Sequence, residues 1–114
     1  MNIQIFGVRR CFKTKKAERY FKERRIKYQF IDLTVRGLSK GELQSVKTAV
    51  GLENLIDNES KHYKRLNLDH IGGAKVREEI LLNNPCLYKT PIVRNGRQAT
   101  VGFEPDVWKS WEGC

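Results

Sequence analysis

The chain has 114 residues, of which 39% are hydrophobic and 31% are charged, and its net charge at neutral pH is +9. This length can enclose one hydrophobic core, whereas two domains would each be too small to fold easily alone, so we expect a single domain. No stretch approaches the roughly 20 consecutive apolar residues of a membrane span, and the first residues lack the order of a secretion signal. We therefore expect a cytoplasmic protein without a membrane-spanning segment.

The first third of the chain alternates between strand and helix patterns. Residues 3–6 form a short apolar run, and residues 28–33 combine aromatic and β-branched side chains, so both segments are predicted to be strands. Between them, Ala17, Tyr20 and Phe21 recur at helical spacing, with lysines and arginines at the other positions. A strand, a helix and a strand in this order predict a βαβ unit with parallel strands.

The middle of the chain is predicted to be helical. Ser39 and Glu42 have the spacing of a capping box, in which the two residues satisfy free N–H groups at a helix start, and Gly51 is a plausible helix terminator. Residues 52–68 predict only short helical turns with an exposed loop at residues 57–60. A further helix is predicted over residues 73–82.

The last part of the chain changes to a strand period. Residues 91–94 and 98–101 flank Asn95 and Gly96, a pair that favours a hairpin with a type I′ turn. Pro105 suits the first turn of a final helix. Three residues of that helix are expected to pack against the sheet: Val107, Trp108 and Trp111. Together the patterns predict an α/β, thioredoxin-like fold with four strands in a mixed sheet, βαβ first and ββα last.

Cys11 is the candidate reactive residue. It opens the first predicted helix, where the N–H groups of the first turn have no partner within the helix and the helix dipole is positive. Both effects favour a thiolate, so we expect the pKa of Cys11 to lie below its usual value of about 8.5. The alternative is a small buried apolar side chain, and the lysine-rich neighbourhood argues against it.

The excess positive charge lies entirely in the first 40 residues. These hold twelve Lys or Arg and three acidic residues, whereas residues 41–114 hold ten of each. Such a concentration would lower the pKa of the thiol and attract anions, including glutathione, oxyanions, acidic protein surfaces or phosphate backbones. The alternative is an ordinary solvated helix face.

The other candidate metal-binding or redox residues are isolated. The three cysteines, Cys11, Cys86 and Cys114, form no CxxC pair and have no zinc-type spacing, and His62 and His70 stand apart from them. We therefore expect neither a disulfide framework, nor a metal site, nor a bound cofactor.

Four segments, residues 5–17, 60–68, 89–93 and 101–103, resemble in this order those of the ArsC/Spx family of thioredoxin-fold proteins. The resemblance covers nearly the whole chain. It implies a core formed by about residues 1–34 and 89–114, with about residues 35–88 inserted between the two halves as a helical subdomain.

The resemblance also implies the layout of the site around Cys11. We expect three residues of the first helical turn to stabilise the thiolate: Lys13, Thr14 and Lys15. The family carries a cis proline opposite the thiol, in a loop that here corresponds to Lys89, Thr90 and Pro91. From the Thr-Pro dipeptide alone, an ordinary trans proline opening a strand is the alternative.

Arsenate reductases of this family hold the oxyanion with three arginines that this chain lacks. The matching positions are Thr90, Asp57 or a neighbour, and a site within residues 102–104, and none is an arginine. Lys89, Arg9 or Arg10 would replace them only in part, because a lysine or a displaced arginine does not supply the same bidentate hydrogen bonds. Efficient arsenate reduction is therefore not expected.

Two functions remain. The first is a monothiol oxidoreductase in which Cys11 forms a mixed disulfide that glutathione or glutaredoxin resolves, with Cys86 either a resolving or a structural thiol. The second is an Spx-like regulator that binds the RNA polymerase alpha subunit. Thr14 replaces the second cysteine of the Spx redox switch, and Gly51 falls close to a glycine that Spx uses at that contact. Direct nucleic-acid binding is not expected, because the basic region has few aromatic residues to stack on bases.

Overall fold

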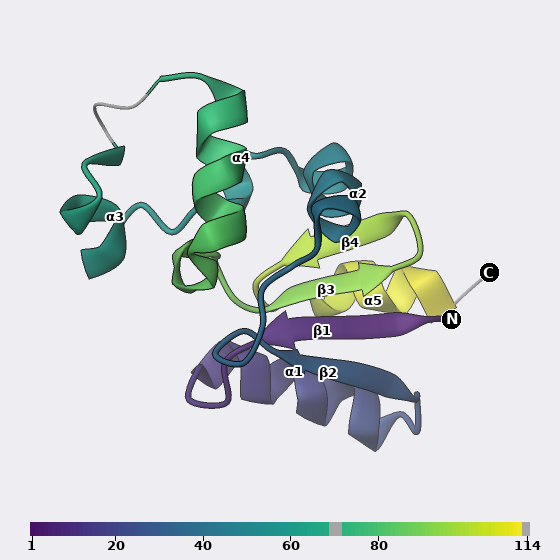
Figure 1. Ribbon diagram of the computed structural model, residues 1–114. Helices are drawn as coiled ribbons and strands as arrows, with labels where there is room; N and C mark the ends of the chain where they lie inside the picture. The colour runs from purple at the N-terminus through teal and green to yellow at the C-terminus, as the bar shows by residue number, and fades with distance from the viewer. Residues whose placement is uncertain (69–71, 113–114) are drawn as a thin grey trace.

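The computed structural model describes residues 1–68 and 72–112. Four strands form one mixed sheet in the order β2-β1-β3-β4, with β1 (Ile3–Gly7) parallel to β2 (Tyr28–Asp32) and antiparallel to β3 (Ile92–Asn95) (Figure 1). The last strand, β4 (Gln98–Val101), pairs antiparallel with β3. The predicted βαβ and ββα units are therefore confirmed, and both contribute to the same sheet.

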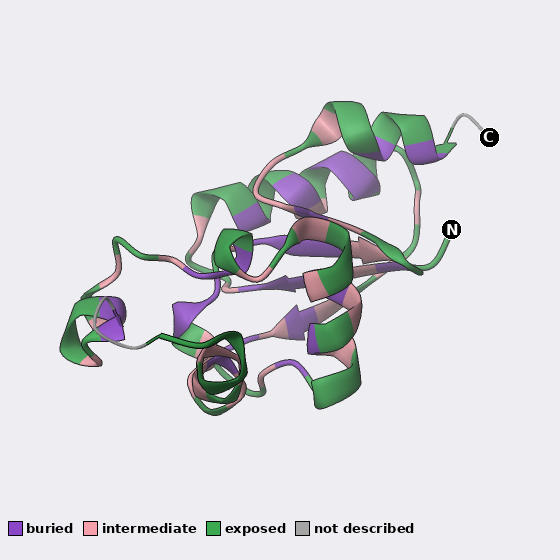
Figure 2. Ribbon diagram, turned by 90° about the horizontal axis from the view of Figure 1, so that it is seen from above, coloured by how far each residue is buried: buried purple, intermediate pink, exposed green. Residues whose placement is uncertain are grey.

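Two helices cover one face of the sheet, α1 (Phe12–Glu23) and α5 (Pro105–Glu112). Figure 2 shows that their buried sides face the strands. Trp108 lies at the centre of this layer with no exposed surface, and its ring centroid is 5.2 Å from that of Phe21. Its indole N–H donates to the Thr100 hydroxyl at 2.8 Å, so the largest side chain of the core also has its polar atom satisfied.

The other face carries the helical segment between β2 and β3. Its elements are α2 (Lys40–Val50), η1 (Glu53–Leu55), α3 (Lys61–Arg65), α4 (Ala74–Asn83) and η3 (Pro85–Leu87). Phe6 and Ile92 of the sheet share an apolar cluster with Leu43 of α2 and Leu81 of α4. This segment is therefore continuous with the core on that side of the sheet. Within residues 1–68 and 72–112, no helix has the length and apolar character that crossing a bilayer requires.

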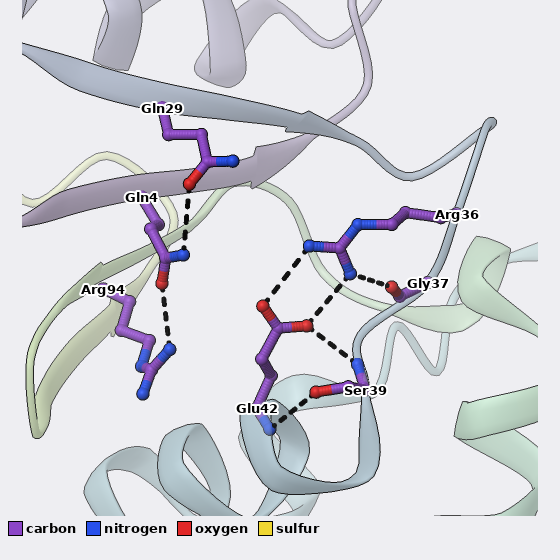
Figure 3. Close-up of polar contacts among 7 residues, drawn as sticks. All are labelled: Gln4, Gln29, Arg36, Gly37, Ser39, Glu42 and Arg94. Atoms are coloured by element: carbon purple, nitrogen blue, oxygen red, sulfur yellow. Dashed lines mark hydrogen bonds and ion pairs between the residues drawn. The ribbon is translucent and has the colours of Figure 1, made fainter.

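The start of α2 confirms the predicted capping box. The Ser39 N–H donates to the Glu42 carboxylate at 2.8 Å, and the Glu42 N–H donates to the Ser39 hydroxyl at 3.2 Å (Figure 3). Arg36 adds two hydrogen bonds to the same carboxylate, at 3.0 and 3.3 Å. Partial burial alone would raise the pKa of Glu42, but these donors hold it below its usual value. The entry to α2 is thus held by side chains that the sequence places next to one another.

Two local predictions for the last part of the chain are wrong. The two-residue loop of the hairpin is Gly96-Arg97, because Asn95 still pairs with Gln98 in the ladder. Only Gly96 has a positive φ there, which is the pattern of a type II′ turn rather than type I′. Val107 is 39% exposed instead of packing against the sheet, because α5 turns Trp108 and Trp111 inward. His70 and Cys114 lie outside the described residues.

Gly7 is required by the close packing of β1 against α1. A Cβ atom at position 7 would lie 2.6 Å from the Cγ2 atom and 2.7 Å from the hydroxyl oxygen of Thr14, whose side chain is fully buried. We expect Gly7→Ala to destabilise the protein by about 1–3 kcal/mol through overpacking. Urea unfolding at pH 7, followed by tryptophan fluorescence, measures this change.

The matched control is Gly41→Ala in the first turn of α2, where an added Cβ meets no atom within 4 Å. It should leave stability unchanged or raise it by up to about 1 kcal/mol, because alanine favours helix over glycine. Equal stability of Gly7→Ala and the native chain would contradict the tight contact with Thr14.

Candidate functional site

Cys11 occupies the N-cap position of α1. Its backbone is extended, its N–H donates to the Val8 carbonyl at 2.9 Å, and its carbonyl accepts from the Lys15 N–H at 3.1 Å. The half-buried side chain makes no capping hydrogen bond to the helix. The sulfur is therefore held at the helix start by the backbone alone and is available to groups from elsewhere in the fold.

The loop before β3 supplies the nearest of those groups. Because Phe6 of β1 pairs with Ile92 of β3, the end of one strand meets the start of the other at the same edge of the sheet (Figure 1). The Thr90 hydroxyl donates to the Cys11 sulfur at 3.1 Å, and the Thr90 carbonyl lies 3.8 Å from the same sulfur. The Thr90–Pro91 bond is cis, as the resemblance implied.

The surroundings of the sulfur favour its charged form. Partial burial would raise the pKa of Cys11, but the nearby Thr14 hydroxyl, the Thr90 hydroxyl that donates to the sulfur, and the nearby N–H groups of Thr14 and Lys13 outweigh it, so the pKa lies below its ordinary value. The Thr14 hydroxyl is fully buried with no hydrogen-bond partner of ordinary geometry, yet it lies close enough to the sulfur to favour the thiolate. These donors produce the low pKa that the sequence predicted for a helix start.

The remaining residues of the predicted site lie at different positions relative to the Cys11 sulfur. Lys13 acts on the sulfur through its backbone N–H, and its exposed side chain lines the adjoining cleft. The Lys15 N–H donates to the carbonyl of Cys11 instead, and its side chain is exposed away from that cleft. Lys89 is exposed and lines the cleft, while Pro91 is buried beneath the loop.

A cleft of about 730 Å³ adjoins Cys11. It lies between the start of α1, the end of α2, the loop before α3, the Thr90 loop and the segment that joins β4 to α5. Its charged lining residues are Lys13, Asp57, Glu59, Lys89 and Glu104. Its apolar lining residues are Val50, Ala99, Val101 and Val107. Among the residues that the structure describes, no arginine lines this cleft.

The concentrated positive charge of the first 40 residues does not converge on this cleft. Of those basic side chains, only Lys13 lines it. Arg9 pairs with Asp32 at 3.8 Å and lies over the Phe30 ring, while Arg36 holds Glu42. Most of the basic side chains of this segment therefore lie outside the lining of the cleft, and the positive field around the thiol stays a prediction.

Sequence reasoning missed the role of Glu59 and Glu104 as lining residues. Both are separated from Cys11 by more than 45 positions, and no periodicity connects them to it. The signal that could have found them was the comparison with the family's arsenate reductases, because Asp57 or a neighbour and a site within residues 102–104 match positions at which those enzymes carry oxyanion-binding arginines.

Cys86 is exposed on η3 and is not among the lining residues. Within the described ranges, no three His, Cys, Asp or Glu residues are arranged to hold a metal ion.

Comparisons with known proteins agree with this architecture. Residues 6–111 match the model of the ArsC family. The global transcriptional regulator Spx 2 of Oceanobacillus iheyensis is 32% identical over 110 residues, covering 93% of this chain and 80% of the relative. The regulator Spx of Staphylococcus aureus is 26% identical over 108 residues, covering 91% and 82%.

A solved structure shows the same fold. The arsenate reductase from Vibrio cholerae superposes with a TM-score of 0.86 at 22% identity, over 96% of this chain and 97% of its own. At that identity the likeness is one of fold alone. With a family match over nearly its full length and a thioredoxin-like sheet carrying Cys11 at the start of α1, the chain belongs to the ArsC family.

Proposed function

We propose that this protein is a monothiol oxidoreductase that acts through Cys11 and is coupled to glutathione or glutaredoxin. The observation that carries the proposal is the Cys11 sulfur itself, which borders an open cleft and accepts a hydrogen bond from the Thr90 hydroxyl at 3.1 Å. A thiolate is the nucleophile in disulfide exchange, and the donors around this sulfur keep it ionised at lower pH.

The reaction needs one protein sulfur and an external reductant. The Cys11 thiolate attacks one sulfur of an oxidised partner, so that a new S–S bond forms as the old one breaks and the other sulfur leaves as a thiolate. A glutathione thiolate then attacks the Cys11 sulfur and releases the reduced partner. A second glutathione attacks the glutathionyl sulfur, which restores Cys11 and yields oxidised glutathione. Two glutathione molecules thus supply the two electrons.

The residues around Cys11 support a single-thiol cycle. Thr14 occupies the position at which a CxxC switch would carry its second cysteine, and its hydroxyl favours the thiolate without being able to form a disulfide. The Thr90 carbonyl lies 3.8 Å from the sulfur, and Thr90 lines the cleft in which a partner would bind. Lys13 and Lys89 are the only cations that line the cleft within residues 1–68 and 72–112, which argues against tight binding of a tetrahedral oxyanion such as arsenate.

Removing the Thr90 hydroxyl should make the thiol less reactive. In a chain whose other cysteines are serine, we expect Thr90→Val to raise the pKa of Cys11, since a donor to the thiolate is lost. Alkylation by iodoacetamide below the thiol pKa should slow by about two- to fivefold, because the gain in thiolate nucleophilicity offsets only part of the loss. The measurement is the alkylation rate as a function of pH.

Two control variants show whether the effect comes from the loss of the hydroxyl at position 90. Thr90→Ser keeps the donor and should retain the native pH profile, and Thr48→Val removes an exposed hydroxyl on α2, outside the cleft. An unchanged profile in Thr90→Val would mean that the hydrogen bond to the sulfur does not control its ionisation.

The coupling to glutathione is tested directly by mass spectrometry. Incubation with oxidised glutathione should place one glutathionyl group on Cys11, and glutaredoxin with reduced glutathione should remove it. The Cys11→Ser variant should carry no adduct at that position. If the native chain also stays unmodified at Cys11 while remaining folded, the oxidoreductase proposal fails.

A second candidate function is regulation of transcription by binding the RNA polymerase alpha subunit. The observation that favours it is the 32% identity to an Spx regulator over most of the chain. Gly51, which ends α2 with a φ of 87°, and the exposed basic side chains of α1 would offer surface for such contact. This function does not require the chemistry of Cys11.

Binding to the isolated C-terminal domain of the alpha subunit separates the two functions. If the chain is a regulator, Arg19→Glu with Lys22→Glu on α1 should weaken binding at least tenfold, while Cys11→Ser should leave it unchanged. Lys109→Glu on α5 combined with Arg97→Glu in the hairpin loop, both exposed and outside α1, changes the net charge by the same amount and controls for it. Absence of binding by the native chain would remove this candidate.

A further inference from the structure

The cleft beside Cys11 is acidic, although the chain as a whole carries a net charge of +9. Three carboxylates, Asp57, Glu59 and Glu104, line it against two ammonium groups, Lys13 and Lys89. None of these five charged residues belongs to an ion pair found within residues 1–68 and 72–112. The carboxylates of the cleft therefore outnumber its ammonium groups by one, and in the described part of the chain none of them is held in an ion pair.

The three carboxylates are arranged to meet an extended ligand rather than a single ion. Asp57 and Glu59 lie in the loop before α3, whereas Glu104 lies directly before α5, so the acidic groups come from two separate segments of the fold. In the described part of the chain they form no cluster that could hold a metal ion. The Asp57 carboxylate accepts the Glu59 N–H at 3.2 Å, and the Asp57 backbone carbonyl accepts the Ser60 N–H at 3.3 Å.

The sulfur marks the point at which such a ligand would be attached. Thr14 is fully buried, its hydroxyl has no hydrogen-bond partner of ordinary geometry, and it lies against the Cys11 sulfur together with the Thr90 hydroxyl. The cleft volume of about 730 Å³ is far larger than a disulfide requires. Val50, Val101 and Val107 also line it, and apolar walls of this kind suit the aliphatic stems of lysine and arginine.

We propose that the oxidised partner of Cys11 is a cysteine in a basic peptide segment, with lysine or arginine within one or two residues of its sulfur. This inference rests on the proposed thiol chemistry of Cys11 and further specifies that the partner segment is positively charged. The Cys11 thiolate attacks the partner's sulfur in its mixed disulfide, the new S–S bond forms as the old one breaks, and the displaced group leaves as a thiolate. Glutathione enters afterwards as the reductant.

The charges that line the cleft and the net charge of the whole chain predict opposite preferences for the charge of the partner, so an experiment can distinguish them. The net charge of +9 alone would favour an acidic partner. At physiological ionic strength charges are screened beyond about 8 Å, so the side chains that line the cleft should outweigh the distant lysines and arginines. A preference for basic peptides would therefore have to come from the cleft.

The test uses three short peptides, each with one cysteine linked to 5-thio-2-nitrobenzoate and flanked by lysine, glutamine or glutamate. Attack by Cys11 on the peptide sulfur releases the coloured thiolate, and its rate is measured at 0.15 M salt in a chain with Cys86 and Cys114 replaced by serine. Each rate is divided by that of N-acetylcysteinamide with the same peptide, which corrects for intrinsic reactivity. We expect the basic peptide to react about tenfold faster than the acidic one after this correction.

Variants that remove carboxylate charges test whether the preference for the basic peptide comes from the cleft. Asp57→Asn combined with Glu104→Gln should reduce the ratio to about one or below, and asparagine keeps an oxygen that can accept the Glu59 N–H. Glu79→Gln, an exposed residue of α4 outside the cleft, changes the net charge in the same direction and should leave the ratio unaltered.

The outcomes separate this inference from the proposed function. If the glutamine-flanked peptide fails to react with Cys11, the thiol chemistry itself is wrong. If it reacts but the acidic peptide is equal to or faster than the basic one, the thiol chemistry stands and the basic partner is excluded. A basic preference that survives in the Asp57→Asn, Glu104→Gln chain would also overturn the role of the cleft.

Discussion

The central position of β1 is the constraint on which the candidate site depends. β1 runs parallel to β2 and antiparallel to β3, so its C-terminal end meets the N-terminal end of β3. Cys11 follows the first of these ends and Thr90 precedes the second, and the two residues, 79 positions apart, come within 3.1 Å. Apolar clusters on both faces of the sheet hold β1 in place, because Ile5 faces α1 and α5 whereas Phe6 faces α2 and α4.

Small side chains let the helix that carries Cys11 approach this strand. Gly7 has no Cβ, which leaves room for Thr14 to lie in the core directly below the start of α1. The same threonine contributes to the low pKa of Cys11. Packing and thiol chemistry are therefore coupled at this point: a change that displaces Thr14 would alter both the stability of the core and the ionisation of the sulfur.

The three-dimensional distribution of charge differs from its distribution along the chain. Several basic residues of the first 40 positions are engaged in local ion pairs, as Arg9 is with Asp32 and Arg36 is with Glu42. The cleft instead draws most of its charge from the rest of the chain, residues 41–114, where acidic and basic residues are equal in number. A positive chain can thus present a locally acidic site, and the local groups matter most for a ligand held in the cleft because screening weakens the distant ones.

The sequence by itself determined the elements and the candidate reactive residue. Apolar periodicity located the strands and helices, Ser39 and Glu42 located the start of α2, and the helix-start position of Cys11 predicted its low pKa, because all of these depend on neighbours within a few residues. Tertiary structure alone decided which residues surround the sulfur. The Thr90 hydroxyl, the carboxylates of Asp57 and Glu104 and the outward turn of Val107 depend on how distant segments pack, and no local pattern encodes that packing.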